Sequence, residues 1–226
     1  MESYSYHKEL KRIIALTGHY GCGKTNLALN LAVEFRSLGE EVTIVDLDIV
    51  NPYFLTSDYT DMLEALGIRV ISSGYAGTQI ETPSIPREIS AAIVAGQGRL
   101  IIDVGGDDVG ARALGRFHGD IDKTTGIDLL YLFSIYRPQT GTALDVKRHI
   151  EAIEIASRQK VGYLVNSSNL GADTQIEDVE ESNTFAEHLS EYLQIPLLFT
   201  LAKEEINKEG YHMVKRYVKL PWETSN

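Results

Sequence analysis

The chain has 226 residues, 43% of them hydrophobic and 23% charged, which is ordinary for a soluble globular protein. Its formal net charge of −11 argues against a general nucleic-acid surface, because such a surface needs clustered lysine and arginine. The sequence has no run of 18 apolar residues to span a membrane, and its one cysteine, Cys22, excludes an intrachain disulfide and makes the cytoplasm the expected location.

Short apolar runs alternate with longer amphipathic segments along the chain. In chain order we expect a strand at 12–18, a helix at 24–38, a strand at 41–48, a helix at 52–66, a strand at 68–73, a helix at 85–96, a strand at 99–106, a helix at 108–117, a strand at 128–136, a helix at 142–158, a strand at 161–168, a helix at 176–193 and a strand at 195–202. This alternation predicts an α/β fold of three layers, α/β/α, around a mostly parallel, doubly wound sheet. No linker rich in Pro, Gly or Ser interrupts it, so we expect a single domain over 1–226, with a core at about 10–205 and a peripheral segment at 206–226.

A phosphate-binding loop is predicted between the first strand and the first helix. The sequence GHYGCGKT fits the pattern G-x-x-x-x-G-K-[ST], in which glycines allow successive backbone N–H groups to face phosphate oxygens. The lysine supplies a positive charge to the phosphates and the threonine hydroxyl can ligate Mg²⁺. The predicted nucleotide-binding residues of this loop are Gly18, His19, Tyr20, Gly21, Cys22, Gly23, Lys24 and Thr25.

Acidic residues end two of the predicted strands, at the edge of the sheet where open α/β proteins bind ligands. Asp103 follows an apolar run, which is the usual place for the second Mg²⁺ anchor opposite Thr25. Asp46 and Asp48 end another strand; we expect Asp46 to be a further metal candidate and Asp48 to orient the attacking water.

Together these motifs resemble the MinD/ParA branch of the SIMIBI class of P-loop NTPases, which also includes CobB-type synthetases. The resemblance covers roughly residues 10–205 and rests on the loop at 18–25, D-x-D at 46–48 and D-x-G-G at 103–106. It implies an ATP-binding, Mg²⁺-dependent slow ATPase or nucleotide switch, with Lys24 and Asp48 as catalytic residues. It also implies a nucleotide-dependent homodimer coupled to a protein or small-molecule partner.

The chain departs from this family at the second loop residue, which is typically a lysine that reaches the phosphates of the partner subunit. Here it is His19, which is charged only part of the time near pH 7. Arg112, Arg116 and Arg137 are alternative sources of that charge, and no motif distinguishes them.

The loop at 164–169 suggests which base is bound. Its sequence, LVNSSN, resembles the family's base-binding loop and places Asn166 where it would contact adenine. A GTP-binding relative would be expected to carry N-K-x-D here, but Ser167 and Asn169 replace the informative residues, which favours ATP and ADP as ligands.

Two other enzymatic functions and one without catalysis remain open. An amide ligase similar to CobB or dethiobiotin synthetases would phosphorylate a bound carboxylate, and a small-molecule kinase would use Asp46 or Asp48 as base for a substrate hydroxyl. A nucleotide-binding module without catalysis would follow if Asp48 contacts no water and His19 leaves the site without the positive charge that it needs.

The C-terminal segment raises the question of membrane binding. Tyr211, Val214, Tyr217 and Val218 follow helical spacing beside basic residues, as in a short interfacial helix. Because the segment is short and Pro221 would stop the helix, we expect it to pack on its own domain and not on a membrane.

Overall fold

The sheet of the protein has eight strands, all paired in parallel, in the computed structural model, which describes residues 5–47, 59–72, 87–106 and 108–218. The spatial order is β3-β2-β4-β1-β5-β6-β7-β8. The strands are β1 (Ile13–Gly18), β2 (Val42–Leu47), β3 (Arg69–Ser72), β4 (Arg99–Val104), β5 (Ile127–Phe133), β6 (Val161–Asn166), β7 (Leu197–Lys203) and β8 (His212–Val214).

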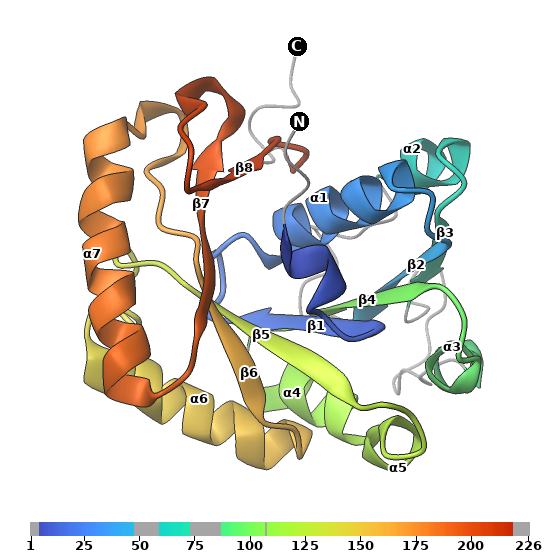
Figure 1. Cartoon of the computed structure of the whole chain (residues 1–226). Coiled ribbons are helices and arrows are strands. Elements are labelled where there is room, and N and C mark those ends of the chain that lie inside the picture. Colours follow the sequence, from blue (N-terminus) through green and yellow to red (C-terminus); the bar gives the residue numbers. More distant parts are fainter. Residues whose placement is uncertain (1–4, 48–58, 73–86, 107, 219–226) are drawn as a thin grey trace, which may run out of the picture.

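Helices cover both faces of this sheet and make the outer two layers (Figure 1). Helices α1 and α2 lie on one face, and α3 to α7 lie on the other. The helices are α1 (Lys24–Ser37), α2 (Thr60–Ala65), α3 (Arg87–Val94), α4 (Asp108–Gly115), α5 (His118–Ile121), α6 (Ala143–Ser157) and α7 (Ile176–Leu193), with 3₁₀ turns η1 (Ser5–Lys8), η4 (Gly171–Asp173) and η5 (Glu204–Ile206). The predicted three-layer α/β/α fold is confirmed.

The central strands are buried along their whole length because they are covered on both faces. Every residue of β1 and of β5 is buried, as their mostly apolar sequences predicted. Helix α6 packs Val146, Ile150 and Ile153 into the same core cluster. It begins where expected, because the Thr142 hydroxyl accepts a hydrogen bond from the backbone N–H of Asp145.

The order of the strands places a ligand crevice at the carboxyl end of β1. From β1 the chain crosses to β2 on one side, whereas from β4 it crosses to β5 on the other. The connections therefore diverge around β1, and the loops that follow β1, β4 and β5 meet at one edge of the sheet. Such a switch point is where open α/β sheets bind their ligands.

The C-terminal segment is not the short helix that its spacing suggested. Residues 212–214 form β8, which pairs with β7, and the backbone of Lys215 exchanges two hydrogen bonds with the Asn30 side chain of α1. The backbone N–H groups of Tyr217 and Val218 donate to Asn26 of the same helix. The backbone groups that a helix would pair internally are thus used by β7 and α1.

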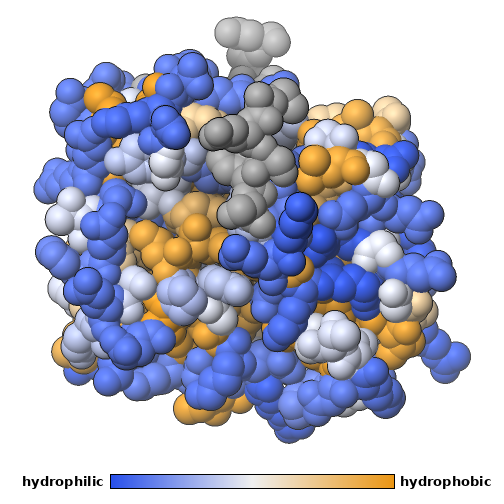
Figure 2. Space-filling model, viewed as in Figure 1, coloured by the Kyte–Doolittle hydropathy of each residue, from blue (hydrophilic) through white to orange (hydrophobic). Residues whose placement is uncertain are grey.

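The α1 face of the sheet is partly apolar at the surface near its β8 side. Near β6 and β7 it is lined by partly buried apolar residues, and Figure 2 shows an apolar patch on that side. These residues are Tyr163, Leu198, Phe199 and Leu201. No helix in the described part of the chain is long and apolar enough to cross a membrane.

Candidate functional site

The predicted phosphate loop joins β1 directly to α1, as the motif requires. Strand β1 ends at Gly18 and α1 begins at Lys24. Between them, Gly18, Gly21 and Gly23 have φ of 137°, 76° and 80°, a region that other residues rarely enter. The first turn of α1 adds the positive end of its dipole at the loop. The loop has the backbone geometry that predicts phosphate binding.

The side chains of Lys24 and Cys22 are buried under the loop and both donate to the same backbone carbonyl. The Lys24 side chain is only 7% exposed, and its Nζ donates to the carbonyl of His19 at 3.5 Å. The Cys22 thiol also donates to that carbonyl, and burial raises its pKa. Cys22 is therefore a protonated structural donor, whereas Lys24 is the cation held inside the loop.

Three residues from different elements form a site that suits Mg²⁺. The hydroxyl of Thr25, in the first turn of α1, donates to Oδ2 of Asp103 at the end of β4, over 2.6 Å. Asp46 of β2 is the direct partner of Asp103 in the parallel pairing, and both aspartates are only 2% exposed. Two neighbouring buried carboxylates need a nearby cation to offset their loss of hydration.

The few oxygen ligands here suit an Mg²⁺ ion whose coordination is completed by waters and phosphates, and they would not make a metal site built from protein ligands alone. No cluster of three or more His, Cys, Asp or Glu residues that could hold a metal occurs in the described ranges. Mg²⁺ usually takes one or two carboxylates, waters and substrate phosphates, so Thr25 and Asp103 beside a phosphate loop match that pattern.

The loop after β4 closely approaches the phosphate loop. A Cβ placed on Gly106 would lie 2.8 Å from both the Gly18 carbonyl and the Tyr20 nitrogen, and 2.9 Å from Lys24 Nζ. These distances are too short for any side chain. The D-x-G-G sequence therefore allows this loop to reach the place where terminal phosphates would lie.

His19 lies beside helix α6 of the same chain. Its ring centroid lies 5.7 Å from that of His149 on α6, and its Nδ1 lies 3.2 Å from the Tyr20 carbonyl. His149 in turn shares a 2.7 Å hydrogen bond with the hydroxyl of Tyr131. A contact of His19 with nucleotide stays a prediction.

Asn166 is fully buried at the end of β6. Its amide nitrogen donates to Ser182 at 2.9 Å and to Thr200 at 3.3 Å, and its oxygen accepts from the backbone N–H and the hydroxyl of Ser168. Its polar atoms are thus engaged inside the protein, and the predicted adenine contact stays a prediction. Among the other predicted residues, Tyr20 is 53% exposed, and Asp48 lies outside the described residues.

Sequence reasoning did not single out Arg137, which the structure places against the phosphate loop. Its Nη2 donates to the carbonyl of Gly21 at 3.0 Å. A signal was available, because Arg137 follows the strand predicted at 128–136 and so stands at the ligand-binding edge of the sheet.

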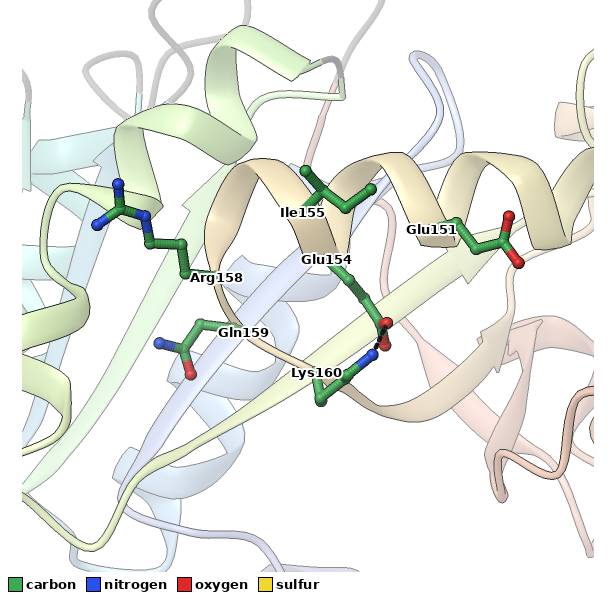
Figure 3. A pocket seen from close by; sticks show the side chains of 6 residues that line it. All are labelled: Glu151, Glu154, Ile155, Arg158, Gln159 and Lys160. Carbon is green, nitrogen blue, oxygen red and sulfur yellow. Dashed lines mark hydrogen bonds and ion pairs between the residues drawn. The ribbon is translucent and has the colours of Figure 1, made fainter.

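A separate surface pocket of ≈ 510 Å³ lies at the other end of α6 (Figure 3). Lys160 and Glu154 form an ion pair on its wall, drawn as a dashed line in the figure. Its lining residues are Glu151, Glu154, Ile155, Arg158, Gln159 and Lys160. The pocket lies at the C-terminal end of the helix, and none of its lining residues belongs to the phosphate loop.

No protein-family model matches the chain, and no curated protein matches it. Solved structures do. The signal recognition particle receptor FtsY from Elizabethkingia anophelis in complex with GDP superimposes with a TM-score of 0.54 at 16% identity, over 90% of this chain and 60% of that one. FtsY from Mycoplasma mycoides gives a TM-score of 0.55 at 14% identity, over 88% and 62%.

The 54 kDa protein of the signal recognition particle from Aeropyrum pernix K1, in complex with GDP, gives a TM-score of 0.51 at 18% identity, over 83% of this chain and 40% of that one. The chain shares the fold of these structures, a parallel sheet between two layers of helices. At such identities the likeness is one of fold, and the chain spans about three fifths of the length of the FtsY structures.

Proposed function

We propose that the chain binds a purine nucleoside triphosphate with Mg²⁺ and hydrolyses it slowly, as a nucleotide-dependent switch. The observation that carries this proposal is the 2.6 Å hydrogen bond between Thr25 and Asp103, beside Lys24 and below the glycine loop. A hydroxyl and a buried lysine in the first turn of α1 thus lie beside a buried carboxylate at the end of β4. A merely structural turn would not need this set of groups.

The proposed reaction transfers the terminal phosphoryl group to water. The water oxygen bonds to the γ-phosphorus, the bond from that phosphorus to the β–γ bridging oxygen breaks, and a water proton passes to a carboxylate, for which Asp48 is our candidate. Lys24 and the loop N–H groups would bind the phosphates, while Thr25 and Asp103, with Asp46 beside them, would hold Mg²⁺. When bound, Mg²⁺ neutralises charge that develops on the phosphate oxygens.

We propose ATP as the nucleotide. Residues 166–171 contain no carboxylate that would accept hydrogen bonds from guanine. Ser167 donates to the Phe133 carbonyl and Asn169 to the Ser167 carbonyl, so both side chains serve the loop itself. Two of the similar structures hold GDP, which makes guanine nucleotide the alternative to test. An adenine contact by Asn166 would require its amide to leave Ser182 and Thr200.

Calorimetric titration with Mg·ATPγS and Mg·GTPγS tests both the site and the base. We expect the wild type to bind ATPγS at least about tenfold more tightly than GTPγS, and Lys24→Ala to abolish detectable binding of both. Lys123→Ala is the matched control, because Lys123 is a surface lysine paired with Asp120 on α5. Equal binding by wild type and Lys24→Ala would contradict a phosphate site in this loop.

A switch is expected to dimerise around its nucleotide and act on a partner. Size-exclusion chromatography with light scattering, with and without Mg·ATP, compares the wild type with Asp48→Ala, which should trap the bound state. A dimer that forms only with ATP would support the switch. ATP binding without dimerisation or turnover would instead favour a ligase or kinase that lacks its acceptor.

A further inference from the structure

The turn after β5 places a cation directly against the phosphate loop. Arg137 Nη2 donates to the Gly21 carbonyl at 3.0 Å. A Cβ placed on Gly21 would lie 3.0 Å from Nη2 and 3.1 Å from Cζ of the same guanidinium. The guanidinium therefore lies against the α-carbon of Gly21, in space that only a glycine leaves open.

The backbone that carries Arg137 is held by buried hydrogen bonds. The Thr140 hydroxyl, fully buried, donates to the Ser134 carbonyl at 2.7 Å, and the Thr140 N–H donates to the Arg137 carbonyl at 3.0 Å. Ser168 ties the turn to the end of β6 by accepting from the Ile135 N–H at 3.0 Å. The arginine thus extends from a preorganised turn, and fewer of its conformations must be lost when a ligand binds.

The other cations suggested by the sequence are placed elsewhere. Arg112 forms an ion pair with Asp108 one helical turn earlier on α4. Arg116 follows the end of α4, where Gly115 contacts Ala156 and Ser157 at the end of α6 that is remote from the loop. His19 lies beside His149. Among the described residues, Arg137 is the one of these three arginines that contacts the phosphate loop.

The hydrogen bond also orients the loop. An outward-facing carbonyl at Gly21 leaves neighbouring N–H groups free to face phosphate, and a guanidinium keeps its charge at any physiological pH. We propose that Arg137 is a positioning residue that holds the Gly21 carbonyl and adds a permanent positive charge beside the phosphate loop. The inference rests on the proposed nucleotide function.

Three substitutions at Arg137 separate charge from hydrogen bonding and from folding. Arg137→Ala removes both, Arg137→Gln keeps a donor without the charge, and Arg137→Lys keeps the charge. Arg116→Ala is the matched control, since it removes the same charge from an exposed arginine far from the loop. The measurements are calorimetric Kd for Mg·ATPγS, kcat for hydrolysis, and the melting temperature with and without nucleotide.

We expect Arg137→Ala to weaken Mg·ATPγS binding about tenfold or more, because one hydrogen bond that involves a charged group typically contributes that much. Arg137→Lys should retain more of the wild-type affinity than Arg137→Gln, and the kcat values should follow the same order. The melting temperature without nucleotide should stay near that of wild type, while the stabilisation by nucleotide shrinks.

Two outcomes would contradict this proposal. If wild type binds normally and the Kd of Arg137→Ala lies within twofold of that of Arg116→Ala, the inference alone is overturned. If wild type binds neither ATPγS nor GTPγS, the proposed function fails and the inference with it.

Discussion

The Thr25 hydroxyl and the Asp103 carboxylate, 78 positions apart in the sequence, are joined by a 2.6 Å hydrogen bond where α1 begins and β4 ends. The pairing of β1 with β4 brings them together, because it aligns Leu16 with Asp103 two residues before the loop begins. This is the geometry from which a magnesium site can form when a nucleotide supplies its phosphate oxygens.

Removal of the Thr25 hydroxyl should remove the magnesium dependence of nucleotide binding. Thr25→Val keeps the shape of the side chain, so we expect folding to persist while Kd for Mg·ATPγS rises about tenfold or more. Thr25→Ser keeps a hydroxyl and is the control, with an expected Kd close to wild type. Titration in Mg²⁺ and in EDTA measures the effect, and an unchanged Thr25→Val would show that the hydroxyl contributes nothing to binding.

A methyl group at Gly106 should disturb the phosphate loop without touching the core. Gly106→Ala would put a Cβ 2.8 Å from the Gly18 carbonyl and the Tyr20 nitrogen, so the two loops must separate. We expect loss of most nucleotide binding, measured by fluorescence of a labelled nucleotide. Gly119→Ala is the control, because a Cβ there meets nothing within 4 Å. Equal affinities for the two variants would contradict this close approach.

Substitution of Asn166 should mainly lower the stability of the fold. Asn166→Ala leaves the hydroxyls of Ser182 and Thr200 without their amide partner in a buried site, at a cost of about 1–3 kcal/mol in the free energy of unfolding. Urea denaturation measures it, with Asn169→Ala on the exposed turn as the control. A variant as stable as wild type that binds ATP poorly would instead favour the predicted base contact.

The stability of the protein should fall as pH decreases from about 6.5 to 4, partly because of His212. Burial lowers the pKa of this histidine to about 4, with a smaller contribution from His7, whereas the Glu34 carboxylate 3.7 Å away opposes that shift. Below its ordinary value of about 6.5 the unfolded chain binds a proton that the folded chain does not, so acid favours unfolding.

The difference between wild type and His212→Gln isolates this contribution. We expect the free energy of unfolding of the variant to depend less steeply on pH over this interval, by roughly 1–3 kcal/mol in total. Denaturation at several pH values checks it, with exposed His188→Gln as the control. Parallel curves for wild type and His212→Gln would mean that Glu34 cancels the effect of burial.

Local patterns in the sequence were enough to predict the layers, the loop and the residues at the strand ends. Mostly apolar runs such as those of β1 and β5 are typical of strands that helices cover on both faces, so the parallel sheet followed from local composition. Lys24, Thr25 and Asp103 could be predicted for another local reason, because phosphate-binding motifs place such residues at fixed positions after the end of a strand.

Which side chains from distant segments meet depends on how the whole chain packs. Strand β8 was missed because three residues gain strand structure only by pairing with β7 and by contact of the following residues with Asn26 and Asn30. The placement of Arg137 against Gly21 and of His19 beside His149 depends on the pairing of β5 with β1, which brings together residues more than 100 positions apart. The spacing of residues along the sequence predicts local backbone geometry, whereas contacts between long polar side chains from distant segments depend on how the elements pack.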